Sequence, residues 1–356
     1  TVSERGRLRV NLGDQLVLKS YRRLLAGVHP ELEMSRFLTD TAKFAHIPQL
    51  IGTVEDAGAD GHGSTFAILE RYAENQGTAW TYTLNYLERF LDACRASPDG
   101  PPDTRHAAYL GSIRTLGLRT AEFHQALALP DAAGAFGTAP ITANDIADWV
   151  NDVQARMESV FDLLEREMPL LPESARLTGS ELTGLRPRLY RLIMRASSVR
   201  PDGLKTRYHG DYSLAQIWLA GNDFLIANYG GEPGRPWAER RRKHSPLRDV
   251  AGMMLSFTAV GAAAMEHVAG DSVEALAALQ AHVDAWGLLA RRTFFRSYRK
   301  ALARDVCPAD ARALESLLSL FLAERTLDAV ETGLAQHSSS VGSALRWLIQ
   351  VAQRRR

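Results

Sequence analysis

Residues 208–233 read YHGDYSLAQIWLAGNDFLIANYGGEP. The carboxylate of Asp211, which directly follows His-Gly, can accept a proton from a hydroxyl group. The amide of Gln216, five residues further on, can reach a metal ion held beside the same loop. The apolar stretch 224–227 predicts a short strand that ends at Asn228. The spacing therefore predicts a polar loop and a short strand that present these side chains together.

This spacing is similar to the kinase pattern H-R-D-x-x-x-x-N, in which the aspartate accepts the substrate proton and the amide holds a metal ion. We therefore expect Asp211 to act as catalytic base or to orient the substrate, with Gln216 and Asn228 near Mg²⁺. His209 is predicted to hydrogen-bond the loop backbone, with contact to the substrate as the alternative. Asn228 stands where such a pattern needs an acidic ligand, and a neutral amide supplies no charge for a hard cation.

The bulk composition excludes several classes of protein. A chain of 356 residues can bury a large core in two lobes or domains. With 42 basic and 41 acidic residues, the net charge of +1 gives no reason to expect nucleic acid or an anionic membrane as partner. Cys94 and Cys307 lie far apart, which fits a reducing cytoplasm. The most apolar window, 250–268, contains Glu266 and His267 and predicts a buried helix, not a membrane span.

Periodicity divides the chain at about residue 75. Residues 1–75 predict a small sheet with one inserted helix, and residues 76–356 predict a mostly helical lobe that contains the polar loop. The expected strands and helices of the first part are a hairpin around Gly13-Asp14, a helix from Pro30 to Leu38, and strands at 48–54 and 65–71. The expected helices of the second part are 84–96, 105–129, 143–168, 181–198, and a series from Leu247 to the end.

Lys19 ends a predicted strand, and Glu33 lies on the helix that follows it. In kinases a strand lysine holds the nucleotide phosphates and a helix glutamate orients that lysine. We therefore expect Lys19 and Glu33 at a nucleotide site. The stretch 67–72 would be the connection between the lobes, whose backbone would receive the adenine.

The chain resembles the maltokinase family over nearly its whole length. The matching segments are Leu16–Lys19 with Tyr21–Arg23, Pro30–Glu33 with Arg36–Leu38, Asn75–Gly77, Arg119–Glu122 with His124, Tyr208–Tyr212, Gly231–Pro233 and Ser245–Met253. The resemblance implies an α+β, bilobal fold of the protein-kinase-like or aminoglycoside-phosphotransferase-like kind, with a small β-rich N-lobe and a larger, mostly helical C-lobe. It also implies transfer of a phosphoryl group from ATP, with Mg²⁺, to maltose or a related sugar, giving maltose 1-phosphate.

The sequence departs from the family at polar positions. Where the family has Asp-Phe-Glu-Gly-Glu-Pro, this chain has Asn228-Tyr229-Gly230-Gly231-Glu232-Pro233, and the family's phosphate-side loop is replaced at 5–9. The family's N-terminal cap and first strand are not recognisable, so we expect a fragment of a longer polypeptide. Three hypotheses follow. One is a sugar kinase weakened at its metal site. The second is a catalytically silent domain that binds or scaffolds, as a domain or subunit partner of trehalose synthase. The third is a kinase for another small sugar or an aminoglycoside-like amine, because the sequence near Thr78 and Asp328 departs from the family.

Overall fold

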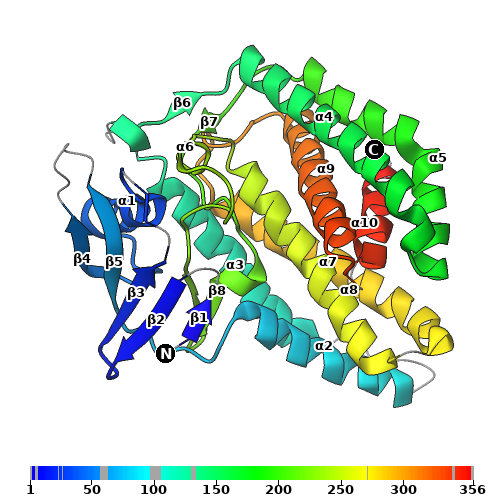
Figure 1. Ribbon diagram of the computed structural model, residues 1–356, viewed down its shortest axis with the longest axis horizontal. Helices are drawn as coiled ribbons and strands as arrows, with labels where there is room; N and C mark the ends of the chain where they lie inside the picture. The colour runs from blue at the N-terminus through cyan, green and yellow to red at the C-terminus, as the bar shows by residue number, and fades with distance from the viewer. Residues whose placement is uncertain are drawn as a thin grey trace.

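The computed structural model describes residues 2–4, 7–22, 24–25, 27–56, 63–96, 106–129, 134–270, 272–338 and 341–353. These residues form the predicted α+β, bilobal arrangement, in which a small sheet lies beside a larger group of helices (Figure 1). The predicted fold class is confirmed.

The small lobe is built on a five-stranded antiparallel sheet in the order β1-β2-β3-β5-β4 (Figure 1). Its strands are β1 (Val2–Glu4), β2 (Arg7–Leu12), β3 (Leu16–Tyr21), β4 (Leu50–Asp56) and β5 (Ser64–Arg71). The predicted hairpin is present as β2 and β3, and Gly13 at its turn has φ +61°, a value that favours glycine. The sequence analysis does not predict β1, a strand of only three residues.

Helix α1 (Pro30–Arg36) follows β3 and packs against both lobes. Pro30 starts the helix where no backbone N–H is needed, and the Nδ1 of His29 accepts a hydrogen bond from the first turn. Leu32 is fully buried against the sheet, whereas Met34 belongs to the core of the large lobe. Because one short helix contributes to both cores, it fixes the orientation of the sheet relative to the helical lobe.

The large lobe is mostly helical. Its helices are α2 (Ala79–Ala96), α3 (Ala107–Ala126), α4 (Ala143–Glu167), α5 (Glu173–Arg195), α6 (Trp237–Arg240), α7 (Leu247–Ala269), α8 (Val273–Ala301), α9 (Ala311–Ala335) and α10 (Val341–Gln353). Helix α7 covers the predicted apolar window and packs against α2, α8 and α9 (Figure 1). None of the helices in the described ranges is both long and apolar enough to cross a membrane. Helix α5 starts earlier than the predicted 181, and Pro187 is accommodated inside it.

Two small two-stranded sheets position the polar loop. Strands β6 (Ala139–Pro140) and β7 (Leu204–Lys205) pair, and so do β8 (Ile217–Ala220) and β9 (Asp223–Ile226). The backbone of Leu219 in β8 accepts from the N–H of Gln76 at 2.8 Å and donates to the oxygen of Gly77 at 3.0 Å. The connection between the lobes runs from 72 to 78, because residues 67–71 of the predicted connection belong to β5. It is held against β8, directly after the polar loop.

Candidate functional site

The polar loop between β7 and β8 is fixed by a carboxylate far away in the sequence. Asp249, in the first turn of α7, accepts hydrogen bonds from the backbone N–H of His209 at 2.7 Å and of Gly210 at 3.0 Å. The Nε2 of His124 lies 3.2 Å from the same carboxylate. Burial raises the pKa of Asp249, but the hydrogen bond and charge of His124 outweigh it and the pKa is lowered. A buried carboxylate therefore sets the position of the loop backbone.

The loop also closely approaches the turn that follows β9. Gly210 has φ +83°, and a Cβ at this position would lie 3.0 Å from the Cα of Gly231. A side chain there would separate the loop from the turn, so the glycine in the quoted motif has a steric reason.

Asp211, Gln216 and Asn228, the three residues predicted to lie together, are joined in a chain of hydrogen bonds. The side-chain nitrogen of Gln216 donates to Asp211 Oδ2 at 2.7 Å. The side-chain nitrogen of Asn228 donates to the oxygen of Gln216 at 3.0 Å. Asn228 has φ +60°, a conformation that asparagine and aspartate adopt more readily than other non-glycine residues. The backbone therefore holds residue 228 in a position from which its side chain reaches Gln216.

These three residues do not fit a magnesium site. The amide oxygen of Gln216 already accepts from Asn228, and Asp211 is the single carboxylate of the set. Within the described parts of the chain, no group of three or more His, Cys, Asp or Glu residues is placed to hold a metal ion. Mg²⁺ dehydrates reluctantly and is normally held by carboxylates together with phosphate oxygens. The arrangement supplies one negative charge where a metal-dependent site needs more.

His209 is fully buried, and its imidazole serves the loop. Its Nε2 lies 2.9 Å from the backbone oxygen of Ala227, and its Nδ1 accepts from the backbone N–H of Asp211 at 3.2 Å. Burial lowers the pKa of His209 despite the nearby acidic groups. The alternative prediction, contact of His209 with a substrate, is wrong because the ring has no exposed surface.

Lys19 lies at the inner face of the sheet, but its partner differs from the predicted one. Its ammonium is 3.2 Å from Glu31 Oε1 and 2.9 Å from Glu70 Oε2, and all three side chains are buried. Burial raises the pKa of Glu70, although the charge of Lys19 acts against this. The expectation that Glu33 orients Lys19 is wrong. Glu31 takes that position, and Glu70 is a second carboxylate that the sequence analysis does not identify.

Glu33 instead forms ion pairs between α1 and the large lobe. Its carboxylate accepts from Arg207 at 2.5 Å and from Arg241 at 2.9 and 2.7 Å. Burial raises the pKa of Glu33, but the hydrogen bonds from Arg241 and Arg207 dominate and the pKa is lowered. Arg207, directly before the polar loop, is almost fully buried and lies over the ring of Phe136. Helix α1 is thus tied to both ends of the segment that contains the polar loop.

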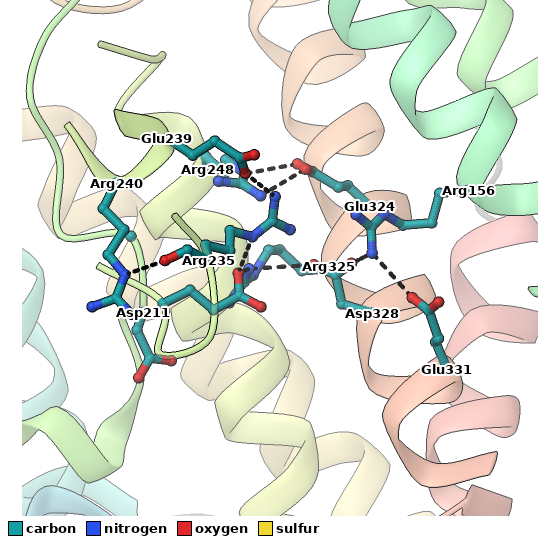
Figure 2. A network of polar contacts seen from close by, with 12 residues as sticks. Arg156, Asp211, Arg235, Glu239, Arg240, Arg248, Glu324, Arg325, Asp328 and Glu331 are labelled. Carbon is teal, nitrogen blue, oxygen red and sulfur yellow. Dashed lines mark hydrogen bonds and ion pairs between the residues drawn. The ribbon is translucent and has the colours of Figure 1, made fainter. Parts of the chain in front are cut away.

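A pocket of about 560 Å³ borders the polar loop on the side of α4 and α9. Gly210 and Gly231 line it, together with Tyr208, Arg235 and Glu324. Figure 2 shows that arginines and carboxylates alternate along this side, between the 235–248 segment and α9. The sequence analysis misses this network, although charged residues within the apolar stretch 320–334 of α9 could have indicated it.

Arg248 and Glu324 form the buried centre of this network (Figure 2). The guanidinium binds both carboxylate oxygens at 2.9 and 2.8 Å and donates to the hydroxyl of Tyr208 at 2.7 Å. Burial raises the pKa of Glu324, but the charge of Arg248 outweighs it and lowers the pKa to about 2. Next to this pair, Glu232 accepts from Arg235 at 2.9 Å. Glu232 and Glu324, two of the carboxylates that line this pocket, therefore already face arginines.

Comparison with known proteins identifies the fold. No protein-family model matches the chain. A solved glucosamine kinase superposes on 97% of this chain and 77% of its own, with a TM-score of 0.73 at 22% identity. Another, in complex with glucosamine, ADP and inorganic phosphate, superposes on 97% of this chain and 78% of its own, with a TM-score of 0.68 at 22% identity. The fold is that of kinase-like sugar phosphotransferases.

Two curated relatives match this kinase-like chain in sequence. It is 28% identical over 315 residues to a glucosamine kinase of Mycolicibacterium smegmatis, covering 86% of this chain and 69% of that protein. It is 30% identical over 189 residues to a glucosamine kinase of Streptacidiphilus jiangxiensis, covering 53% of this chain and 38% of that protein. The chain thus spans 38% and 69% of these relatives. The finer prediction of a maltokinase linked to trehalose synthase stays a prediction.

Proposed function

We propose that this chain is the kinase-like part of a sugar phosphotransferase, in which the proton acceptor is kept and the metal-binding charge is lost. The observation that carries the proposal is the hydrogen-bonded set Asp211–Gln216–Asn228, which has one carboxylate and two amides. Phosphoryl transfer depends almost entirely on positioning and on neutralising charge. We therefore expect transfer to be much slower than in a working kinase.

In the proposed reaction the hydroxyl oxygen of a sugar attacks the γ-phosphorus of ATP. The bond from that phosphorus to the bridging oxygen of ADP breaks, and ADP leaves with the electron pair. Asp211 accepts the proton of the sugar hydroxyl, and Lys19 faces the phosphates from the sheet. The matches to glucosamine kinases, one of them solved with ADP, support ATP as the donor and a sugar as the acceptor.

We propose that the acceptor is a neutral sugar, for which maltose is the candidate that the maltokinase resemblance gives. The matched relatives are glucosamine kinases, and an ammonium group is best held by an unpaired carboxylate. Two carboxylates of the pocket, Glu232 and Glu324, are already paired with arginines. At these two positions a protonated amino sugar would have to compete with those arginines, whereas neutral hydroxyl groups would not.

A silent binding domain is the second candidate, and the surroundings of Lys19 favour it. In this chain two buried carboxylates, Glu31 and Glu70, neutralise the lysine that would otherwise attract phosphates. Such a domain would bind a sugar or a partner, for which trehalose synthase is the expectation from the resemblance.

Release of ADP from ATP, measured with maltose, glucose and glucosamine in turn, tests these proposals. Asp211→Asn is the control that removes the proton acceptor. We expect slow transfer, well below the roughly 1–100 s⁻¹ typical of kinases, that Asp211→Asn abolishes and that is faster with maltose than with glucosamine. A rate within the typical range would contradict the argument from Asn228. Equal background rates in both proteins would leave the silent domain as the function.

A further inference from the structure

Arg9 and Trp218 touch across the two lobes. Arg9 lies on β2 of the sheet and Trp218 on β8, directly after the polar loop. The central guanidinium carbon of Arg9 lies 4.7 Å from the centroid of the Trp218 ring. This is a cation–π contact, which is strongest on the face of an indole.

The contact lies between the two parts of the chain that a nucleotide would have to reach. Arg9 is the direct cross-strand neighbour of Lys19, so both side chains lie on the same face of the sheet. On the other side, Trp218 pairs with Thr78 of the segment that connects the lobes. A nucleotide with its phosphates near Lys19 and its base near this connection would have to place the base against Trp218.

The space over Trp218 is too small for a base while Arg9 lies there. Planar groups in contact lie about 3.5–4.0 Å apart, so a base stacked between the indole and the guanidinium needs roughly 7 Å. The observed separation is 4.7 Å. An aromatic ring is a good surface for any base, so the guanidinium and a base compete for the same face.

The Nε of Arg9 does not help to hold the side chain in place. This nitrogen is buried and has no hydrogen-bond partner among the described residues. A buried donor without an acceptor costs free energy, and this cost disfavours the position in which the guanidinium lies over Trp218. A nucleotide base that competes for the ring of Trp218 can therefore displace the guanidinium.

We propose that Arg9 decides whether the space between the sheet and β8 accepts an adenine nucleotide, because its guanidinium occupies the face of Trp218 on which the base would stack. The inference rests on the proposed function, in which ATP binds between Lys19 and the polar loop. Replacing Arg9 by alanine exposes the ring face of Trp218. Replacing it by lysine keeps the positive charge but covers less of the ring.

Titration calorimetry with ADP in the absence of divalent metal ions tests this. Arg9→Ala is expected to bind ADP about tenfold more tightly than the natural chain, the size expected from one cation–π contact. Arg188→Ala is the matched control, since Arg188 is an exposed arginine of α5, outside the sheet and the polar loop, and it should bind as the natural chain does. Adding Trp218→Leu to Arg9→Ala should remove the gain. Unchanged or weaker binding by Arg9→Ala, or a gain that survives Trp218→Leu, would overturn the proposal.

The same proteins separate this inference from the proposed function. If Arg9→Ala gains ADP affinity but phosphorylates no sugar, the inference about Arg9 holds and the proposed phosphotransferase activity is contradicted. If the natural chain binds ADP as tightly as Arg9→Ala and phosphorylates a sugar, Arg9 is no gate and the phosphotransferase stands. Thermal unfolding of each variant checks that the fold is retained.

Discussion

The side-chain nitrogen of Asn228 donates a hydrogen bond of 3.0 Å to the side-chain oxygen of Gln216. A carboxylate at position 228 could not donate this bond, and the oxygen of Gln216 would become available to a cation. The carboxylates of Asp211 and of residue 228 would then face a common point. The left-handed backbone at Asn228 also accepts aspartate. Exchanging the amide nitrogen of residue 228 for an oxygen would therefore replace the hydrogen bond to Gln216 with a group that can bind a metal ion.

Asn228→Asp is expected to make ADP binding depend on Mg²⁺. Changes around metal ligands alter affinity by ~10–100-fold, and we expect a gain of at least about tenfold with Mg²⁺ and none without it. Calorimetry in the Arg9→Ala background measures this with the ring face of Trp218 exposed. Asn222→Asp, in the exposed turn between β8 and β9, is the control for the added charge. A gain in both variants, or in neither, would contradict the assignment of the defect to Asn228.

Restoring the second acidic residue at Gly230 should destabilise the fold. A Cβ at Gly230 would lie 2.9 Å from the Cβ of Glu31, closer than carbon atoms pack. We expect Gly230→Ala to lower the free energy of unfolding by about 1–3 kcal/mol, because α1 must move away from the turn. Gly184→Ala is the control, since a Cβ there meets nothing within 4 Å in α5. Equal effects in denaturant unfolding would show that α1 moves without cost.

Glu33→Gln should weaken the connection between the lobes. Arg207 would keep its buried charge but lose the carboxylate that pairs with it at 2.5 Å. Loss of one partner of a buried pair costs several kcal/mol, and we expect about 3 kcal/mol in denaturant unfolding. Glu55→Gln breaks the exposed pair between Glu55 and Arg36 and should cost less than about 1 kcal/mol. A similar small loss in both variants would mean that Glu33 stabilises nothing beyond a surface pair.

Local spacing predicts the polar loop well, and helix register explains the main error. Asp211, Gln216 and Asn228 lie close in sequence around one hairpin, so their meeting could be expected from the sequence. Glu31 and Glu33 are two residues apart, which places them about 200° apart around a helix. The sequence shows that one of them can meet Lys19, but not which, because the rotation of α1 is set by the burial of Leu32 and Met34.

Contacts between distant segments account for what the sequence analysis misses. Asp249 holds the polar loop from α7, and Glu324 meets Arg248 from α9. The sequence separation of these residues does not predict either contact, because both contacts depend on how the helices of the large lobe pack. Arg9 is similar, because its contact with Trp218 needs both lobes in place. The sequence analysis treats its segment only as a replacement of the family's phosphate-side loop.

Acid should destabilise this chain through His244. The ring is partly buried, stacked on Trp149 with centroids 4.4 Å apart, and edge-on to Phe321. Burial, followed by the charge of Arg248, lowers the pKa of His244 from 6.5 to about 3. Between these values the unfolded chain binds a proton that the folded chain does not, so the free energy of unfolding falls as the pH falls from 6.5 towards 3.

From pH 7 to pH 5 this single group should remove about 2 kcal/mol of stability. His244→Phe keeps an aromatic ring against Trp149 but cannot titrate, so its free energy of unfolding should fall by about 2 kcal/mol less over this range. Urea unfolding at pH 7, 6 and 5 measures the slope, which matters here more than the absolute stability of the variant. His267→Phe, at an exposed position of α7, is the matched control and should keep the slope of the natural chain. An unchanged slope in His244→Phe would mean that His244 is not the group whose buried neutral form links folding to pH.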